Sequence, residues 1–319
     1  MQICQEIVYP GSGGFWNPMG LELARKSTYN TFMRRIPLRF FPVLGVLFSL
    51  CGNSFALIQE QESCWPNGRE KGSYQAKIAS TGKLLWQVHW QTTVTKEQGR
   101  SRVRIDEQGE GTPWRAREPL VWKKKMLFDE GPVQPPAAAG PGHLAMQVQS
   151  VVGSRWSEDG RPMGEMDFEV DPGLRRILYK DAEPGKKSQT VILPWTSRSI
   201  PDELLFHWAR TLPFQPAAGQ EPPVSEFTLV VSPKRQFRIR AEVSGTEMVT
   251  TPAGTFSCYR VELTPQLPAP LKVFAPRMAL WCRTEPPNYW VRYRGPVGGP
   301  GSPEVVIELV EFEQEETSR

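Results

Sequence analysis

A two-residue alternation of apolar and polar side chains recurs along most of this chain. In the stretch from Phe237 to Val243, the odd-numbered residues are apolar and the residues between them are charged. Since successive side chains of a β-strand point to opposite faces, this pattern predicts strands with one buried and one solvated face. The same pattern predicts further strands within residues 84–91, 144–152, 166–170, 227–231, 259–263, 278–282, 290–293 and 305–309.

Turn-forming residues separate the alternating segments. The 319 residues include 31 prolines and 27 glycines, and proline removes a backbone donor and disrupts long helices. Four turn signals lie between predicted strands: Glu158-Asp-Gly160, Asp171-Pro-Gly173, Glu183-Pro-Gly185 and Ser232-Pro-Lys234. We therefore expect a mainly β fold in which antiparallel strands follow one another as a meander, without a βαβ alternation.

One segment, residues 200–212, has a helical pattern instead. Ser199 precedes it as a candidate N-cap, Pro201 stands early, and two acidic residues occupy the first turn. Leu204, Leu205, Trp208 and Leu212 then form an apolar stripe at helical spacing. The pattern predicts one short helix packed against the sheet.

The first 56 residues are interpreted as a leader. From Met33, three arginines precede an apolar stretch, Phe40 to Leu50, which is too short to span a bilayer as a helix. Small residues at Ser54 and Ala56 suit signal-peptidase cleavage after Ala56, which predicts Sec-dependent export to the periplasm or another extracytoplasmic compartment. Residues 1–32 are expected to be an upstream extension.

Lipidation of Cys51 is not expected, because Leu50 stands where a lipoprotein cleavage site needs a small residue. Without residues 1–56 the chain has 33 basic and 32 acidic residues, so its net charge is +1 and the alkaline pI near 8.8 reflects the leader. This balance does not indicate a nucleic-acid binder. We expect residues 57–319 to form one antiparallel β domain.

Two cysteines, Cys258 and Cys282, fall in neighbouring predicted strands and are candidates for a disulfide. An oxidising compartment permits such a bond. Two buried free thiols are the alternative, and the spacing alone does not decide between them.

The residues after the predicted helix resemble a known family. Pro201-Asp-Glu-Leu204 and Trp208 to Leu212 precede Thr251-Pro-Ala-Gly-Thr-Phe256, which leads into the strand Cys258 to Leu263. This order is similar to that of the bacterial exported domain of unknown function 3108 family, over residues 72–264. The first motif departs from the family's usual form. The resemblance implies an open antiparallel β-barrel, a curved sheet wrapped around the helix as in periplasmic lipoprotein carriers. Residues 271–313 would then be a C-terminal strand extension.

Thr251 to Phe256 also has a direct structural interpretation. Pro252 and Gly254 suit successive positions of a tight turn, so the segment predicts a hairpin corner.

No residue pattern points to catalysis, a metal or a cofactor. The histidines, His89, His143 and His207, have no ligand at metal-site spacing, and no G-x-S-x-G elbow is present. The run Lys123 to Lys125 is interpreted as a solvated strand edge. We expect a protein that is not an enzyme.

Ten tryptophans lie beyond the leader, and they carry the remaining information on function. Against a curved sheet they would either fill the core or line a cavity for an acyl chain. The candidate cavity residues are Trp86, Trp90, Trp208, Trp281 and Trp290.

The first hypothesis is therefore a periplasmic carrier of a hydrophobic envelope ligand, a lipid or an acyl chain, in the sheet concavity. The second is an interaction module for envelope assembly, whose partner is another protein. The third is a polysaccharide or peptidoglycan hydrolase.

Overall fold

A computed structural model describes the part of the chain that carries the sheet. The described residues are 65, 68–97, 100–114, 116–132, 144–182, 184–185, 187–196, 198–214, 224–268, 275–297 and 302–316. The chain divides into two compact units, Met1–Leu57 and Ile58–Arg319, and all described residues belong to the second. The predicted leader, the cleavage site after Ala56, Cys51 and His143 lie outside the described residues.

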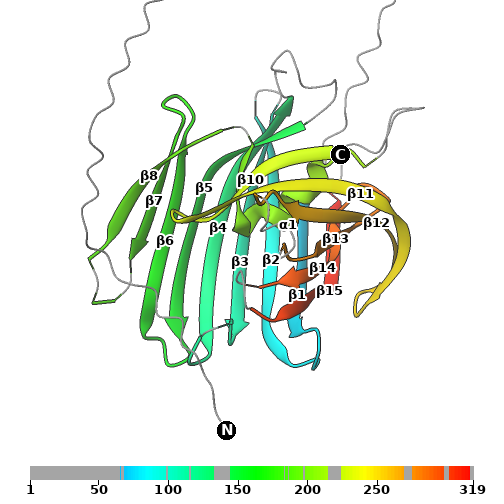
Figure 1. Cartoon of the computed structure of the whole chain (residues 1–319), viewed down its shortest axis with the longest axis horizontal. Coiled ribbons are helices and arrows are strands. Elements are labelled where there is room, and N and C mark those ends of the chain that lie inside the picture. Colours follow the sequence, from blue (N-terminus) through cyan, green and yellow to red (C-terminus); the bar gives the residue numbers. More distant parts are fainter. Residues whose placement is uncertain are drawn as a thin grey trace, which may run out of the picture. The chain divides into compact units, whose positions relative to one another are not determined.

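Fifteen strands form one sheet (Figure 1). Their order across the sheet is β8-β7-β6-β5-β4-β3-β2-β1-β15-β14-β13-β12-β11-β10-β9, and every pair is antiparallel except β9 with β10. The bounds are β1 Gly68–Ile78, β2 Leu84–Glu97, β3 Arg100–Gly111, β4 Leu120–Pro132, β5 Leu144–Ser157, β6 Pro162–Asp171, β7 Arg176–Ala182, β8 Gln189–Pro194, β9 Ser199–Pro201, β10 Val224–Ser232, β11 Arg235–Thr251, β12 Gly254–Pro265, β13 Met278–Arg283, β14 Trp290–Pro296 and β15 Glu304–Glu316.

The predicted meander is confirmed, because nearly all sequential strands pair with each other. The four turn signals fall between β5 and β6, β6 and β7, β7 and β8, and β10 and β11. Thr251 pairs with Gly254, so the segment predicted as a hairpin corner joins β11 to β12, which curl away together in Figure 1. Gly254 has a positive φ of 134°, a conformation that glycine adopts readily.

The strands predicted as a C-terminal extension stand in the middle of the sheet. β15 pairs with β1 on one side and with β14 on the other. The last strands therefore join the first eight strands to β9–β12, and they are integral to the sheet.

The two ends of the sheet come together at one corner. The end strands are β8 and β9, and only residues 195–198 separate them in the chain. Five residue steps span at most about 18 Å, so the sheet has to curl until its ends approach each other. Backbone bonds complete the corner: Trp195 N donates to Arg175 O and Thr228 N donates to Arg198 O, each over 2.8 Å. The sheet is curved and not closed, in agreement with the predicted open barrel.

The helical segment is shorter than predicted. Within residues 200–212 the structure has the end of β9, a 3-10 turn η1 at Asp202–Leu204, the α-helix α1 at Leu205–Trp208 and a second 3-10 turn η2 at Ala209–Thr211. Ser199 does not cap a helix; it belongs to β9, and its backbone pairs with Thr228 of β10. The parallel pairing of β9 holds the first residues extended, which is why the helix starts late. None of the helices in the described part is long and apolar enough to cross a membrane.

The main apolar core fills the space between the sheet and the helical segment. We call the sheet surface that faces this segment the inner face, and the opposite surface the outer face. Leu204, Leu205 and Leu212 are buried in this core together with inward residues of most strands. A second, smaller cluster includes Val249 and Cys258 and lies against the β11–β12 hairpin. A bulge between Val243 and Gly245 shifts the alternation of β11, so that Val243 contacts the first cluster and Val249 belongs to the second.

Candidate functional site

The five tryptophans predicted to line a cavity lie in the two apolar clusters. Trp86, Trp90, Trp208 and Trp290 belong to the main core, and Trp281 belongs to the second cluster. Each packs on other aromatic or charged groups: the ring of Trp290 is 4.6 Å from that of Phe206, and the ring of Trp208 is 4.2 Å from that of Phe227. Their role in holding a ligand stays a prediction.

Of the two alternatives for Cys258 and Cys282, the structure has the two buried free thiols and not the candidate disulfide. Tyr259, not Cys258, pairs directly with Cys282. Since neighbouring residues in a strand point to opposite faces, Cys258 lies in the second cluster and Cys282 in the main core. Burial raises the pKa of the Cys258 thiol to about 11, which keeps it protonated at neutral pH.

A buried ion pair joins the helical segment to β1. Arg210 Nη1 donates to Glu70 Oε2 over 2.7 Å, and both side chains are at most 2% exposed. The guanidinium also lies 4.2 Å from the centre of the Trp65 ring, a favourable cation–π arrangement. Glu70 Oε1 and two of the guanidinium nitrogens, Nε and Nη2, are buried with no hydrogen-bond partner among the described residues. The pair therefore makes one good hydrogen bond, while its remaining buried polar atoms have no partner in the described part of the chain.

A second buried polar contact joins α1 to β3 and β1. Tyr74 donates its hydroxyl to Glu107 Oε1 over 2.8 Å, and His207 Nε2 lies 3.4 Å from the same oxygen. Burial raises the pKa of Glu107, but the hydrogen bond with His207, the charge of Lys124 and the Tyr74 hydroxyl together leave it lowered. Burial, followed by the Glu107 charge, holds the pKa of Tyr74 well above its ordinary value.

The start of the helical segment faces a basic residue of β4. Burial lowers the pKa of Lys124, but the charges of Glu203, Glu107 and Asp202 outweigh burial and leave it raised. Burial and the neighbouring Glu203 hold the pKa of Asp202 well above its ordinary value. In the described chain, its Oδ1 is buried without a hydrogen-bond partner.

These contacts share one side of the helical segment. Glu203, His207 and Arg210 follow each other at spacings of four and three residues, which place side chains on one helical face. Sequence reasoning missed their partners on the sheet, although Glu107 has a readable signal: it continues the inward alternation of Val103 and Ile105. An acidic side chain at an inward, apolar position of a strand needs a polar partner, and the helical segment supplies it here.

The outer face of the same strands carries a hollow of about 890 Å³. It crosses six neighbouring strands, β5, β4, β3, β2, β1 and β15. The outward side chains along it, in this strand order, are Val152, Ser154 and Trp156, then Lys123 and Lys125, then Arg104, Asp106 and Gln108, then His89 and Gln91, then Lys71, then Glu311 and Glu313. A volume of this size matches that of ligand sites in other proteins.

The run Lys123 to Lys125 lies in this hollow and not on a strand edge, which corrects the sequence-based interpretation. β4 is flanked by β3 and β5, so it is an internal strand. Alternation directs Lys124 toward the inner face and leaves Lys123 and Lys125 exposed on the outer face. A central strand has no edge to protect, and these two charges therefore need another explanation.

Most other charges in the hollow are paired. Arg104 Nε lies 2.7 Å from Asp106 Oδ2, and Lys71 Nζ lies 2.8 Å from Glu313 Oε2. Lys123 and Lys125 make no ion pair with any residue that the structure describes. In register, Lys125 stands opposite Asp106, whose carboxylate pairs with Arg104 instead.

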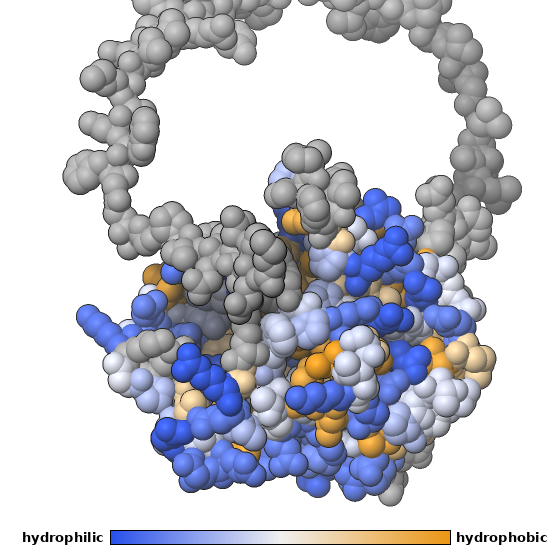
Figure 2. Space-filling view, turned by 60° about the horizontal axis from the view of Figure 1, so that its bottom comes forward, coloured by the Kyte–Doolittle hydropathy of each residue, from blue (hydrophilic) through white to orange (hydrophobic). Residues whose placement is uncertain are grey.

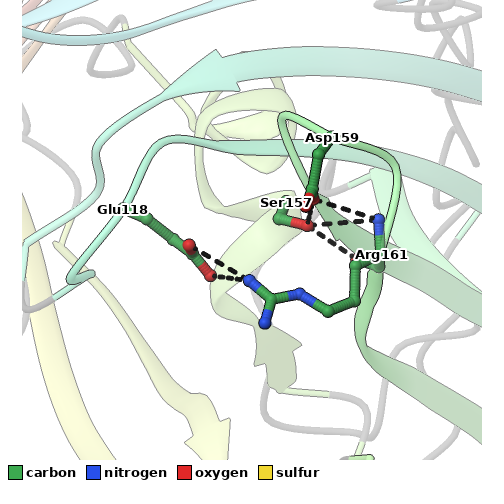
Figure 3. Close-up of polar contacts among 4 residues, drawn as sticks. All are labelled: Glu118, Ser157, Asp159 and Arg161. Atoms are coloured by element: carbon green, nitrogen blue, oxygen red, sulfur yellow. Dashed lines mark hydrogen bonds and ion pairs between the residues drawn. The ribbon is translucent and has the colours of Figure 1, made fainter.

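The turn that follows Trp156 is held by its own polar contacts (Figure 3). Arg161 N donates to Ser157 Oγ over 3.1 Å, and the Arg161 guanidinium reaches Glu118 ahead of β4 over 2.9 Å. The Ser157 hydroxyl donates to Asp159, and this bond, followed by the backbone bond from Arg161, lowers the pKa of Asp159.

Exposed polar residues cover most of the surface in Figure 2, and apolar residues show between them as separate patches.

The described histidines serve in hydrogen bonds. His89 Nε2 lies 3.3 Å from Gln87 Nε2 on the outer face, and His207 is part of the buried contact with Glu107. No group of three or more His, Cys, Asp or Glu side chains in the described part is arranged to hold a metal ion.

Comparison with known proteins gives structural likenesses only. No family model matches the chain, so the similarity to family 3108 remains a resemblance, and no curated protein matches either. A β-barrel-like protein of domain of unknown function DUF1849 from Brucella abortus has a TM-score of 0.43 at 11% identity, over 78% of this chain and 99% of that one.

Two other solved structures also match, each over 78% of this chain and 98% of its own. One, described as an exported protein with a YmcC-like fold from Bacteroides fragilis, has a TM-score of 0.34 at 12% identity. The other, described as a lipoprotein from Parabacteroides distasonis, has a TM-score of 0.32 at 14% identity. At these TM-scores the three structures give no argument about the function of this chain.

Proposed function

We propose that this protein is a non-enzymatic binding protein of the bacterial envelope, and that its ligand occupies the hollow on the outer face of β1–β5 and β15. The observation that carries the proposal is the hollow itself: about 890 Å³, with exposed lysines that lack protein partners in the described chain. Unpaired charges beside an aromatic side chain in a concave surface are typical of ligand sites. The envelope location in this proposal rests on the interpretation of residues 33–56 as an export signal.

The outer face is favoured over the inner one for a structural reason. The helical segment, residues 202–211, covers the inner face, and its charged side chains are matched by Glu70, Glu107 and Lys124 of the sheet. A hydrophobic ligand in the concavity would have to separate these buried partners, and an unpaired buried charge costs several kcal/mol. A ligand in the outer hollow leaves them intact.

Native mass spectrometry of the protein purified from its own envelope tests the proposal. We expect a fraction of the protein to carry a bound mass, and we expect this ligand to slow hydrogen exchange in β2–β4 after it is added back. The Lys123→Gln/Lys125→Gln variant should lose the bound mass. A purely unliganded spectrum, or protection of the helical segment instead of β2–β4, would contradict the proposal.

A second candidate function, recruitment of a partner protein, is supported by the edge of the sheet at β8, which pairs with no further strand in the described part of the chain. β8 ends the strand order, and it exposes Ile192 with 61% of its surface accessible, while Leu174 nearby in the chain is 62% exposed. An extended segment of a partner pairs readily with such an edge. The substitution Val191→Pro would abolish a complex that forms at this edge, and it would leave ligand binding at the outer hollow unchanged.

A further inference from the structure

The unpaired lysines of the outer hollow sit beside its most apolar wall. Lys123 pairs in register with Ser154 of β5, and Lys125 pairs with Val152, which is 45% exposed. Trp156 follows on the same face of β5, two residues beyond Ser154. This end of the hollow therefore offers two ammonium groups next to an indole ring and a valine.

The middle of the hollow is neutral and rich in groups that both donate and accept hydrogen bonds. Gln108 of β3 and His89 of β2 pair in register, and Gln91 follows on the same face of β2. Amide and imidazole side chains present donors and acceptors side by side, which is what a hydroxyl-rich ligand requires. Five interstrand gaps separate β5 from β15, or about 24 Å at the usual strand spacing, so the hollow suits an extended molecule.

We infer that the ligand class of this hollow is an acidic oligosaccharide, a stretch of sugar polymer that carries carboxylates. This inference rests on the binding function proposed above. Lys123 and Lys125 bind the carboxylate, Trp156 packs against the apolar face of a sugar ring, and Gln91, Gln108 and His89 bind its hydroxyl groups. The acidic side chains at the far end, Glu311 and Glu313, disfavour a ligand with negative charge along its whole length.

Two other ligand classes fit the same surface less well. A nucleic acid has a phosphate at every step, so it would bring its backbone against Asp106, Glu311 and Glu313. A lipid chain needs a continuous apolar wall, and the apolar side chains that line the hollow are Val152 and Trp156 of β5 and the largely buried Trp90 of β2, which β3 and β4 separate from β5. Both classes serve as comparison ligands in the test.

Isothermal titration of the purified full chain with hyaluronan hexasaccharide, in which carboxylated sugars alternate with neutral ones, tests the inference. We expect saturable binding that weakens with added salt, and weaker binding of the neutral maltohexaose. Lys123→Gln/Lys125→Gln should lower the affinity for hyaluronan hexasaccharide by about tenfold or more, because two charge-assisted hydrogen bonds are lost. Trp156→Leu should weaken both sugars, and the matched control Lys83→Gln/Lys187→Gln, outside the hollow, should change neither.

The outcomes separate the ligand class from the binding function. If an anionic phospholipid vesicle or a DNA oligonucleotide binds the hollow more tightly than the acidic sugar, and the lysine variant abolishes that binding, the sugar assignment is overturned and the binding function stands. If all four probes leave hydrogen exchange in β2–β4 unchanged and the native protein carries no ligand, both fail. Equal loss of affinity in the control variant would also overturn the assignment, because it would show non-specific charge attraction.

Discussion

Strands β1 to β4 carry charged side chains on both faces, and the two faces satisfy them in opposite ways. On the inner face, Glu70 and Glu107 are buried, and Arg210 and His207 of the helical segment lie against them. On the outer face, exposed lysines such as Lys123 have no protein partner in the described part of the chain. Buried charges without partners destabilise the folded protein by several kcal/mol, whereas exposed charges cost little and remain free to bind.

One set of strands therefore has two roles. The inner charges hold the helical segment in place, because Glu107 binds His207, Glu70 binds Arg210 and Lys124 attracts Glu203. The outer charges do not contribute to packing and are available to a ligand. Substitutions on the inner face should therefore change stability, and substitutions on the outer face should change binding alone.

The largest effect is expected from breaking the buried pair. Arg210→Met leaves Glu70 buried with no partner, and such a change costs about 3–5 kcal/mol of the free energy of unfolding. Urea denaturation followed by tryptophan fluorescence measures the loss. Stability within about 1 kcal/mol of the parent chain would show that the pair is not buried as described.

The double variant Glu70→Leu/Arg210→Met sharpens the same test. Removing both charges also removes their cost of desolvation, and the unsatisfied Glu70 Oε1 and Arg210 Nε no longer exist. We expect the double variant to recover most of the stability that Arg210→Met loses. A double variant as unstable as the single one would indicate that packing on Trp65, and not charge, holds Arg210 in place.

The next effect is expected at Tyr74, and it depends on pH. Tyr74→Phe removes the donor to Glu107 and should cost about 1–3 kcal/mol at neutral pH. Because the folded-state pKa of Tyr74 is raised, its contribution is complete below the ordinary tyrosine pKa and is lost as the pH rises through the folded value. The stability difference between the two proteins should therefore shrink above about pH 10. A constant difference from neutral to strongly alkaline pH would contradict this.

Much of the fold is predictable from the sequence because strand alternation and turn chemistry are local. Residues 251–256 contain the whole signal for their hairpin, and the structure has that hairpin. The sequence leaves the choice between a disulfide and two free thiols open for a non-local reason, since the choice depends on whether Cys258 or Tyr259 faces Cys282. The helix is overestimated because the pairing of Ser199 with β10 holds residues extended that a helical pattern alone would include.

The candidate site is less predictable than the fold. The inward phase of Glu107 is readable from its strand, but its partner His207 is 100 residues away in the chain, and Glu70 lies 140 residues from Arg210. The outer hollow depends on the curvature and register of six strands, which come from distant parts of the sequence. Of the residues that line the hollow, only the basic run that contains Lys123 and Lys125 stands out in the sequence.

A smaller effect of opposite sign is expected at Asp202. Its folded-state pKa is raised by burial and by Glu203, so its contribution to stability is lost as the pH rises from the ordinary aspartate value through the folded one. At neutral pH the ionised carboxylate is therefore unfavourable. Asp202→Asn should raise the free energy of unfolding by about 0.5–2 kcal/mol at pH 7, and the gain should vanish near pH 3, where both states hold the proton. Loss of stability at pH 7 would show that attraction to Lys124 dominates.

The smallest effect on stability is expected from the outer lysines, and this sets the sharpest contrast with the inner face. Lys123→Gln/Lys125→Gln removes two exposed charges that have no protein partner in the described chain, so the free energy of unfolding should stay within about 0.5 kcal/mol of the parent value. The two ammonium groups repel each other, and their removal should shift stability upward if it shifts at all. Thermal melts at low and high salt measure this. A loss above about 1 kcal/mol would mean that these lysines support the sheet, and the division between a structural inner face and a binding outer face would be wrong.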